Sequence, residues 1–363
     1  MIIAAWIIFI FTAIQLWVVL LNAIFRQPLS TNLKDFNPLV SILIPARNEE
    51  QNIRRLLQDI QQQEWKNFEL LVFNDQSTDK TAEIVDACTK TDHRIQLLHS
   101  EGLPDGWLGK NYGCYNLAQQ AKGSYFLFLD ADVRISGTII ADTISKVQQH
   151  KLGLLSIFPK QNMHSWSEYL TVPNMNFILL SLLPLIFVRV LPFSSMAAAN
   201  GQFMLFDAKT YRDTQPHQTF RDNKVEDISI AQSFKKNGIR IACLAGNSSI
   251  SCRMYSSFTE AVNGFSKNVI MFFGNSGILS ILFWLITTLG FIPVLIVLPT
   301  KLIFIYLLML VTIRILISIV SYQNPLKNLL LAMPQQLVLG LIIIKALLNK
   351  SKKAYQWKGR TIS

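Results

Sequence analysis

The fold can be predicted outward from one segment, Tyr125-Phe126-Leu127-Phe128-Leu129-Asp130-Ala131-Asp132. Its first five residues are apolar or aromatic, which is typical of a strand buried on both faces of a sheet. Two aspartates follow directly and stand two positions apart. Because residues i and i+2 of an extended chain point to the same side, Asp130 and Asp132 can converge on one hard divalent cation. A strand-end turn with two solvated carboxylates is the alternative for this motif taken alone.

The residues around this stretch alternate between short apolar runs and polar helical segments. The apolar runs are 39–44, 70–73, 95–98, 125–129 and 153–158, and the helical segments are 49–63, 78–89, 110–121 and 138–150. The alternation predicts βαβ units, and hence an α/β fold with a mostly parallel sheet. Ligands of such sheets bind beyond the carboxyl ends of the strands, so the residues that follow each strand are the candidates for chemistry.

Acidic and polar residues follow the predicted strands. The first strand is followed by Pro45-Ala46-Arg47-Asn48-Glu49-Glu50 and the second by Asn74-Asp75-Gln76-Ser77-Thr78-Asp79. The fourth is followed by Asp130-Ala131-Asp132. A cation held by the last motif would neutralise a diphosphate. Two common nucleotide-binding loops are excluded: no GxGxxG occurs, and Pro104 and Asn111 stand where a P-loop requires Gly and Ser or Thr.

The composition is that of a membrane protein. Of the 363 residues 50% are hydrophobic and only 16% are charged, and the mean hydropathy is +0.31. Charged residues make up about a quarter of an ordinary soluble chain, so the surplus apolar surface requires lipid. The 23 Phe, 7 Trp and 9 Tyr exclude a disordered chain. The 4 Cys form no CxxC pair and no zinc-spaced cluster, which predicts reduced thiols in a cytosol-facing domain.

An uncharged segment at the N-terminus predicts a transmembrane anchor. Residues 1–25 carry no charge and are long enough to span a bilayer, with a buried core helix as the alternative. Arg26 and Lys34 follow this segment. The positive-inside rule therefore places the N-terminus outside and the domain at 38–250 in the cytosol.

Further uncharged segments at 275–348 predict the C-terminal transmembrane helices. Their number, two or three, stays open because Arg314 interrupts one candidate. Another candidate, 328–344, is short and is broken by Pro-Gln-Gln at 334–336, so it could lie in the membrane interface.

The positive charge of the chain is concentrated at its end. The formal net charge is +11, and six cations without any acid lie in the last nineteen residues: Lys345, Lys350, Lys352, Lys353, Lys358 and Arg360. A basic cytosolic tail at 349–363 beside an apolar segment predicts contact with anionic membrane lipids, and no nucleic acid partner is expected.

Four motifs together resemble those of membrane-anchored family 2 glycosyltransferases, which are inverting enzymes with the GT-A fold. The motifs are Ser41–Glu49, Asn74–Asp79, Asp130–Asp132 and Glu226-Asp227. Each is unspecific alone, but their order and spacing over residues 38–270 are specific as a group. The resemblance implies a Rossmann-like GT-A domain with N- and C-terminal transmembrane helices, in a multi-pass enzyme of the bacterial inner (cytoplasmic) membrane whose catalytic domain is cytosolic.

The resemblance also implies where the donor, a UDP-sugar, binds. Pro45, Ala46, Glu49 and Asp75 would receive the base and ribose. Lys110 would contact the diphosphate, with a solvated lysine at a helix start as the alternative. Asp79 would cap the next helix or orient the loop.

The remaining matched residues are implied to carry the chemistry. Asp130 and Asp132 would bind Mg²⁺ or Mn²⁺, with Asp130 also on the donor side, and so stabilise the departing nucleoside diphosphate. Asp227, beside Glu226, would take the proton from the acceptor hydroxyl before in-line attack inverts the anomeric carbon. An acidic pair favoured by the dipole of a helix N-terminus is the alternative for Glu226-Asp227.

The implied site constrains the membrane topology. Asp132 and Asp227 must meet around one sugar, so the chain between them begins and ends on the same membrane face. The apolar segment 169–192 is therefore predicted to be interfacial or re-entrant, and to form an entry for a lipid acceptor. Gly201-Gln202 would contribute to the acceptor side.

An amphipathic helix is predicted at 255–273. Its apolar residues recur at spacings of 4, 3, 4 and 3 and are Phe258, Val262, Phe265, Val269 and Phe272. This helix is expected to lie along the bilayer surface, with a core helix as the alternative.

Three further segments resemble one branch of the family. Asn263–Asn268 stands where processive members carry Gln-x-x-Arg-Trp, which argues against processivity. Its Gly-Phe-x-Lys-Asn sequence, Gly106–Lys110 and Trp357–Arg360 resemble the branch that glycosylates isoprenoid lipids, such as carotenoid-acid (diaponeurosporenoate) and hopene-associated glycosyltransferases. The predicted activity is inverting transfer of a hexose, expected to be glucose, to a hydrophobic membrane acceptor. A polysaccharide or polyprenyl-phosphate-linked transferase and a catalytically inactive membrane scaffold are the alternatives.

Overall fold

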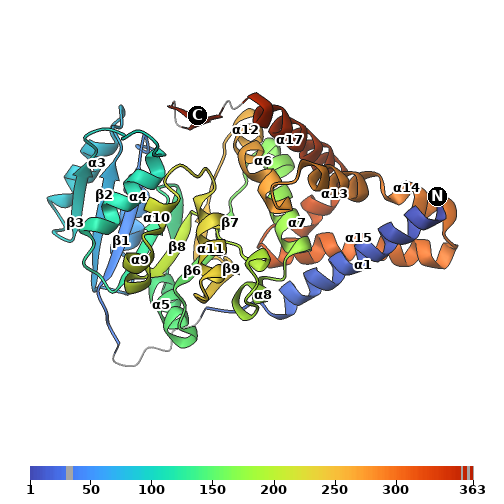
Figure 1. The fold of residues 1–363 in the computed structure, drawn as a ribbon, viewed down its shortest axis with the longest axis horizontal. Coiled ribbons are helices and arrows are strands. Elements are labelled where there is room, and N and C mark those ends of the chain that lie inside the picture. The colour runs from blue at the N-terminus through green and yellow to red at the C-terminus, as the bar shows by residue number, and fades with distance from the viewer. Residues whose placement is uncertain (30–35, 353–354, 358–359, 363) are drawn as a thin grey trace. The chain divides into compact units, whose positions relative to one another are not determined.

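The computed structural model describes residues 1–29, 36–352, 355–357 and 360–362 (Figure 1). The chain divides into two compact units. We call Gln27–Lys160 with Leu185–Cys252 the sheet unit, and Met1–Arg26, Gln161–Pro184 and Arg253–Ser363 the helical unit.

A seven-stranded sheet forms the sheet unit, in the order β3-β2-β1-β4-β8-β6-β9. The strands are β1 Val40–Ala46, β2 Phe68–Asn74, β3 Ile95–His99, β4 Tyr125–Leu129, β6 Leu154–Phe158, β8 Phe203–Asp207 and β9 Ile241–Ala245. β1 pairs in parallel with β2 and β4, β2 with β3 and β6 with β9, whereas β8 runs antiparallel between β4 and β6. The prediction of a mostly parallel α/β sheet is confirmed, and each predicted strand lies within about two residues of its observed bounds.

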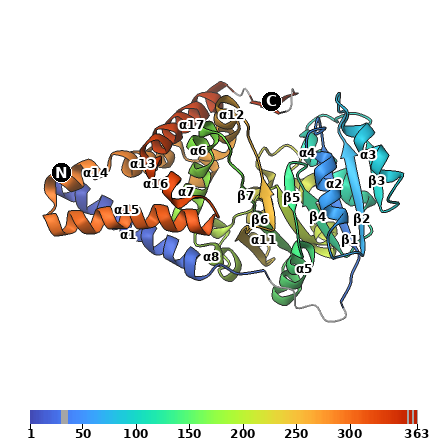
Figure 2. The same cartoon turned by 180° about the vertical axis from the view of Figure 1, so that it is seen from behind.

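Helices cover both faces of this sheet, as Figures 1 and 2 show from opposite sides. One face carries α2 Ile53–Gln61, α3 Thr81–Thr89 and α5 Ile139–His150, and the other carries α4 Gly109–Gln120, α9 Ala208–Thr214, α10 Pro216–Thr219 and α11 Glu226–Lys236. Phe126, Leu127 and Phe128 in β4 are buried because both faces are covered. Full burial of such a side chain contributes about 1.5–3 kcal/mol, so the central strands form a rigid base for the loops at their ends.

A second, three-stranded sheet contains the strand that follows β4 in the chain. β5 Val133–Ile135 pairs with β10 Ile250–Cys252, and β7 Lys160–Gln161 joins the other edge of β10. In this register Cys252 lies opposite Val133, the residue that follows Asp132. The unit also contains α8 Leu185–Val190 and the short helix η1 Ser194–Met196.

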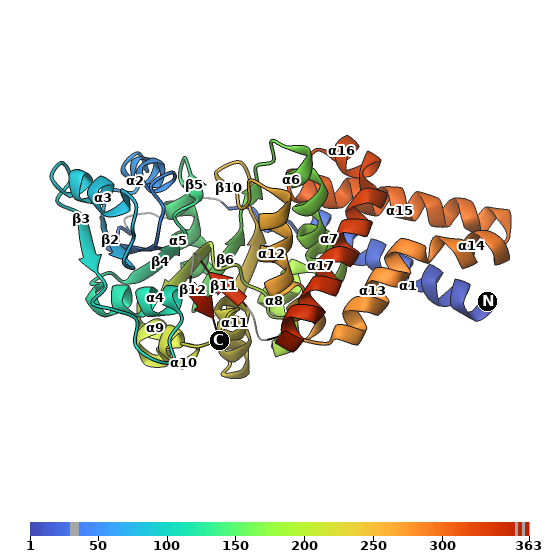
Figure 3. The ribbon, with the colours of Figure 1, turned by 90° about the horizontal axis from the view of Figure 1, so that it is seen from above.

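The helical unit consists almost entirely of helices. They are α1 Ile2–Ile24, α6 Trp166–Thr171, α7 Pro173–Leu182, α12 Phe258–Asn268, η2 Val269–Phe273, α13 Gly277–Leu289, α14 Phe291–Val297, α15 Thr300–Val320, α16 Pro325–Leu330 and α17 Ala332–Lys352. α1 lies beside α15, and α17 lies beside α12 and α13 (Figure 3). A short hairpin of β11 Tyr355–Trp357 and β12 Arg360–Ile362 ends the described chain.

Three described helices are long and apolar enough to cross a membrane: α1, α15 and residues 332–349 of α17. A fourth candidate is the bent pair Phe258–Phe273 and Gly277–Leu289, whose parts meet at 98°. The predicted anchor at 1–25 thus has the length and composition of a span. The predicted basic tail lies outside the described side chains, which end at Asn349.

The apolar run at 169–192 does not form one long helix. It is divided among the end of α6, α7 and α8, with breaks next to Pro173 and Pro184. α7 is held against α1 by hydrogen bonds: Gln15 Nε2 donates to Ser181 Oγ at 3.2 Å, and Asn22 Nδ2 donates to the carbonyl oxygen of Leu180 at 2.9 Å. None of the three helices has the length of a span, and an interfacial or re-entrant position stays a prediction.

The predicted helix at 255–273 is correct only up to Asn268. There α12 gives way to the 3₁₀ turn η2, which ends at Gly274 in a left-handed conformation with φ of 61°. A 3₁₀ turn advances about 120° per residue instead of 100°, so the apolar face rotates. Phe273 is consequently buried, whereas the predicted Phe272 is only half-buried.

Candidate active site

Hydrogen bonds connect the loops that follow β1 and β2. Asp75 N donates to the carbonyl oxygen of Ala46 at 2.9 Å, and Arg47 Nη1 donates to that of Asp75 at 2.6 Å. Glu49 N donates to Thr81 Oγ1 at 2.7 Å. Ala46 and Asp75 are buried, and Pro45 and Glu49 are half-buried. The predicted donor-pocket residues therefore lie together on two interlocked loops.

Asp79 stabilises the second loop and the start of α3. Its Oδ1 accepts hydrogen bonds from Thr81 N at 3.0 Å and Thr81 Oγ1 at 2.5 Å, and its Oδ2 accepts one from Glu50 N at 3.0 Å. Burial opposes ionisation of Asp79, but these hydrogen bonds prevail and lower its pKa. Of the two predicted roles, Asp79 thus has that of orienting the loop, whereas the N-cap residue of α3 is Lys80, whose side chain forms no capping hydrogen bond.

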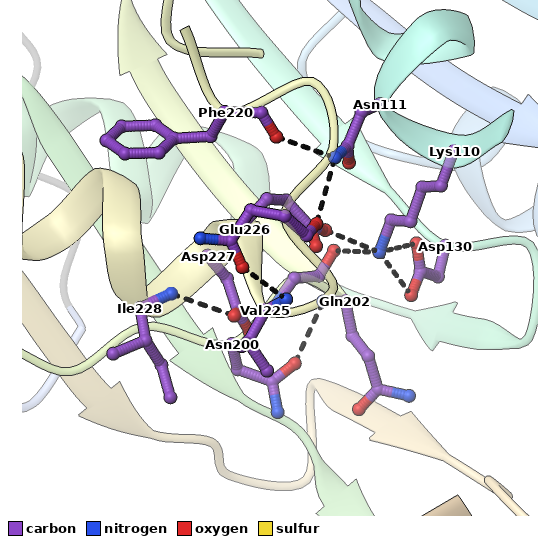
Figure 4. Close-up of polar contacts among 12 residues, drawn as sticks. Lys110, Asn111, Asp130, Asn200, Gln202, Phe220, Val225, Glu226, Asp227 and Ile228 are labelled. Carbon is purple, nitrogen blue, oxygen red and sulfur yellow. Dashed lines mark hydrogen bonds and ion pairs between the residues drawn. The ribbon is translucent and has the colours of Figure 1, made fainter. Parts of the chain in front are cut away.

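Lys110 lies at the centre of a cluster of acidic groups (Figure 4). Its Nζ lies 2.8 Å from Asp130 Oδ1, 3.0 Å from Asp130 Oδ2 and 3.6 Å from Glu226 Oε1, and it donates to the carbonyl oxygen of Gly201 at 3.3 Å. Burial would lower the pKa of Lys110, but Asp130 and Glu226 raise it above its ordinary value. Lys110 is thus a permanent cation in the site, and the alternative of a solvated lysine is wrong.

Glu226 and Asp227 begin α11 on the other side of Gly201. Asp227 Oδ2 accepts a hydrogen bond from Gly201 N at 2.9 Å, and Asp227 Oδ1 accepts one from Ile228 N at 2.8 Å. Burial raises the pKa of Asp227, and it raises that of Glu226 to about 7. Both residues lie in the first turn of α11, where the helix dipole favours acidic side chains. Glu226 additionally forms an ion pair with Lys110.

Gly201 is the point at which these groups approach one another. A Cβ at this position would lie 2.9 Å from Lys110 Nζ, 3.4 Å from Glu226 Oε1 and 3.7 Å from Asp227 Oδ2. The contacts with the two carboxylates are ordinary ones, so a side chain at residue 201 would displace only the end of Lys110 from its present position.

Asp132 lies beside a thiol and an amide. The Cys252 thiol hydrogen-bonds to the Asp132 carboxylate, and Gln202 Nε2 donates to Cys252 Sγ at 2.9 Å. Burial, reinforced by Asp130, raises the pKa of Asp132 to about 7. Asp132 Oδ1 and Gln202 Oε1 are both buried without a hydrogen-bond partner among the described residues. Two buried oxygen atoms next to the Asp130 loop are therefore available to a ligand.

Asn111 fixes the segment that precedes α11. Its Nδ2 lies 2.9 Å from the carbonyl oxygen of Phe220 (Figure 4). It also lies within hydrogen-bonding distance of the carbonyl oxygens of Arg221, at 3.2 Å, and Asn223, at 3.0 Å. Lys110 thus contacts Gly201 and Glu226, and the adjacent Asn111 contacts the segment that directly precedes Glu226. Sequence reasoning missed Asn111 and Cys252, because the carbonyl partners of Asn111 and the Asp132 partner of Cys252 are more than one hundred residues distant in the chain.

The mostly parallel sheet with an acid and lysine cluster at its strand ends defines the architecture of a GT-A glycosyltransferase domain. Residues 41–214 match the family model described as "Glycosyl transferase family 2". This part of the chain is a family 2 glycosyltransferase domain.

Curated relatives include 4,4'-diaponeurosporenoate glycosyltransferases. The chain is 28% identical over 239 residues to that of Staphylococcus haemolyticus, which covers 63% of this chain and 60% of the relative. It is 26% identical over 265 residues to that of Staphylococcus aureus strain N315, covering 67% and 64%. The chain therefore spans less than two thirds of the length of these relatives.

A solved structure supports the fold. The mannosyltransferase PcManGT from Pyrobaculum calidifontis, determined in complex with GDP-Man and Mn²⁺, matches with a TM-score of 0.57 and 16% identity, over 96% of this chain and 99% of that one. At this identity the similarity concerns the fold alone.

Proposed function

We propose that the chain transfers a hexose, glucose in the first instance, from a UDP-sugar to a hydrophobic isoprenoid acceptor in the cytoplasmic membrane of a bacterium, with inversion at the anomeric carbon. The observation that carries the proposal is the convergence of Lys110, Asp130 and Asp227 around Gly201. The family 2 domain and the names of the curated relatives support the reaction and the class of acceptor.

In the proposed mechanism each group of the cluster has one task. Pro45, Ala46, Glu49 and Asp75 receive the nucleotide base and ribose. The permanently charged Lys110 binds the diphosphate and lies within reach of both acidic loops. Its charge stabilises the nucleoside diphosphate as it leaves.

Asp227 acts as the general base toward a hydroxyl acceptor. Its raised pKa brings it closer to neutrality, which makes the carboxylate a better proton acceptor than a solvent-exposed aspartate. Hydrogen bonds from Gly201 N and Ile228 N fix the orientation of the carboxylate before the acceptor arrives.

The residues beside Asp132 fit a hard divalent cation. Within the described residues no three His, Cys, Asp or Glu side chains come together as a metal site. Asp130, Asp132 and the amide oxygen of Gln202 nevertheless provide an all-oxygen donor set, two of whose atoms are buried without partners. These three residues would hold Mg²⁺ or Mn²⁺, which supplies neutralisation of the diphosphate when bound.

The test is Asp227→Asn in the full chain, with UDP binding and sugar transfer measured separately. UDP affinity should stay within about twofold, while transfer to a hydroxyl acceptor falls by about 10²–10⁴. Full retention of transfer to a hydroxyl acceptor would show that Asp227 is not the general base. Absence of both UDP binding and transfer in the unaltered chain would instead favour the inactive scaffold.

The acceptor is identified by comparing lipid extracts from host cells with and without the gene by mass spectrometry. A glycosylated isoprenoid that appears only with the gene is the expected result. Sugar attached to a polymer or to a polyprenyl phosphate would instead support the alternative of a polysaccharide or polyprenyl-phosphate-linked transferase.

A further inference from the structure

The helical unit contains far more cations than acids. Its three segments hold twelve Lys and Arg residues and only two acidic residues, Glu168 and Glu260. Glu168 Oε1 pairs with Arg253 at 2.8 Å, and its Oε2 accepts a hydrogen bond from the backbone at the start of α6. Glu260 Oε2 accepts hydrogen bonds from Ser256 N and Oγ. Both acids of the unit are therefore already engaged.

Arg314 lies on α15 without a carboxylate beside it. Its Nη1 donates to Gln335 Oε1 at 3.1 Å, and its guanidinium carbon lies 4.0 Å from the centroid of the Phe177 ring. No ion pair of Arg314 occurs among the described side chains. A guanidinium offers five N–H donors, so one hydrogen bond to a neutral amide leaves its charge uncompensated, which is costly within a membrane span.

A second cation belongs to the same polar cluster. Lys327 in α16 has its Nζ 4.2 Å from the centroid of the Tyr169 ring. Gln335 Nε2 donates to the carbonyl oxygen of Tyr169 at 2.9 Å and to Asn328 Oδ1 at 3.1 Å, so Gln335 connects the Lys327 side of the cluster with Arg314. Lys327 is exposed, Arg314 is half-buried and Gln335 is fully buried.

Exposed apolar side chains lie along α15 next to Arg314. Phe304, Leu308 and Val311 are 69%, 66% and 38% exposed and recur at helical spacing. Arg314 follows Val311 by three residues, at the border between this stripe and the buried Phe177. It is six residues from the end of α15 at Val320, about 9 Å at the rise of an α-helix. A long basic side chain at that depth can reach the level of lipid headgroups.

We propose that Arg314 and Lys327 bind the phosphate of an anionic phospholipid whose acyl chains lie along the exposed stripe of α15. Phosphate oxygens match the fork of a guanidinium, and the ammonium adds a second positive charge. The anion comes from outside the unit because both acids of the unit are engaged. A lipid fits better than free phosphate, because the cations border apolar surface on a helix long enough to span a membrane. The proposal is independent of the transferase activity.

The test measures lipid binding to the full-length chain in detergent after delipidation, by native mass spectrometry. The probes are phosphatidylglycerol, phosphatidylcholine and inorganic phosphate. Phosphatidylglycerol should bind at least about tenfold more tightly than phosphatidylcholine, because only the former carries a net negative charge. Arg314→Gln and Lys327→Gln should each reduce this preference several-fold. Lys301→Gln, at the exposed other end of α15, is the matched control and should leave it unchanged.

Two results would overturn the proposal. One is an unchanged lipid preference in both variants, and the other is binding of inorganic phosphate as tight as that of phosphatidylglycerol. Thermal unfolding checks that the variants are folded. If Arg314→Gln is unfolded, the test uses Arg314→Lys and Lys327→Gln. If both of these variants prefer phosphatidylglycerol as strongly as the unaltered chain does, the proposal is also contradicted.

Discussion

Replacing Gly201 with alanine should disable the site without changing any charged residue. The backbone of Gly201 is not in the left-handed region, so alanine is excluded only by the position of its Cβ. That atom would lie 2.9 Å from Lys110 Nζ, and the lysine must shift by roughly 0.6 Å to reach an ordinary contact distance. With an effective dielectric constant of about 20, lengthening the 2.8 Å pair with Asp130 by this amount weakens it by about 1 kcal/mol.

This loss corresponds to roughly a fivefold change in an equilibrium constant, and displacement of Lys110 from the diphosphate adds to it. UDP affinity by calorimetry and transfer of labelled hexose should both fall at least about fivefold. The control is Gly153→Ala, whose Cβ meets only the side-chain ends of Ile239 and Thr210. It should lower the melting temperature without weakening UDP binding. Wild-type binding and transfer in Gly201→Ala would refute the assignment of Gly201 as the centre of the site.

Three further predictions follow from the same residues. Asn111→Ala removes the amide that binds three carbonyl oxygens, so it should lower the free energy of unfolding by about 1–3 kcal/mol and reduce transfer, as measured by denaturation and kinetics. Burial raises the pKa of Asp227, and that of Glu226 to about 7, so the protonated forms accumulate as the pH falls. Transfer to a hydroxyl acceptor should therefore decline as the pH falls and Asp227 becomes protonated, and a flat profile from pH 5.5 to 9 would contradict this. EDTA should stop turnover, and Gln202→Leu should weaken Mn²⁺ binding several-fold in paramagnetic resonance, whereas the exposed Gln119→Leu should not.

The strands and the acidic strand ends were predictable because their causes are local. Five consecutive apolar residues at 125–129 avoid water only in the interior of the protein. The charged Asp130 cannot extend that strand further into the core. The parallel pairing of β1 with β2 and β4 then brings the loops after them to one edge of the sheet. Asp75 and Asp130 therefore follow β2 and β4 as predicted, whereas Pro45 lies at the carboxyl end of β1 itself, one residue before Ala46.

The surroundings of Asp132 were not predictable, because they depend on a distant strand. Cys252 reaches the aspartate only through the antiparallel pairing of β10 with β5, more than one hundred residues earlier in the chain. No spacing or composition signals that a thiol and the amide of Gln202 will meet there. The acceptor side stays the predicted position of Gly201-Gln202, and the structure adds that the Gln202 side chain contacts Cys252 beside Asp132.

The environment of the glutamines at the start of α17 was also not predictable from hydropathy. The hydropathy pattern predicts that Gln335 and Gln336 interrupt a membrane segment. In the structure both are buried inside the helical unit. Gln336 Oε1 accepts hydrogen bonds from Thr287 and Thr288 at 3.2 Å each, so the amide oxygen is satisfied within the bundle, whereas Nε2 is buried without a partner among the described residues. A hydropathy sum counts the polar groups of a helix but contains no information about the direction in which they point.

The geometry of Asp227 bears on which acceptor chemistry the site suits. Both of its oxygens already accept a backbone hydrogen bond, from Gly201 and Ile228, so the carboxylate is fixed but retains a free lone pair on each oxygen. A hydroxyl acceptor needs that lone pair, because its proton must leave as the bond to the sugar forms. A carboxylate acceptor, ionised at neutral pH, needs no base and would be repelled by Asp227 and Glu226. Their raised pKa values reduce that repulsion by favouring the neutral forms. The same buried pair can thus serve a hydroxyl acceptor in its ionised form and tolerate a carboxylate acceptor in its protonated form, so the pH dependence of transfer should be opposite for the two.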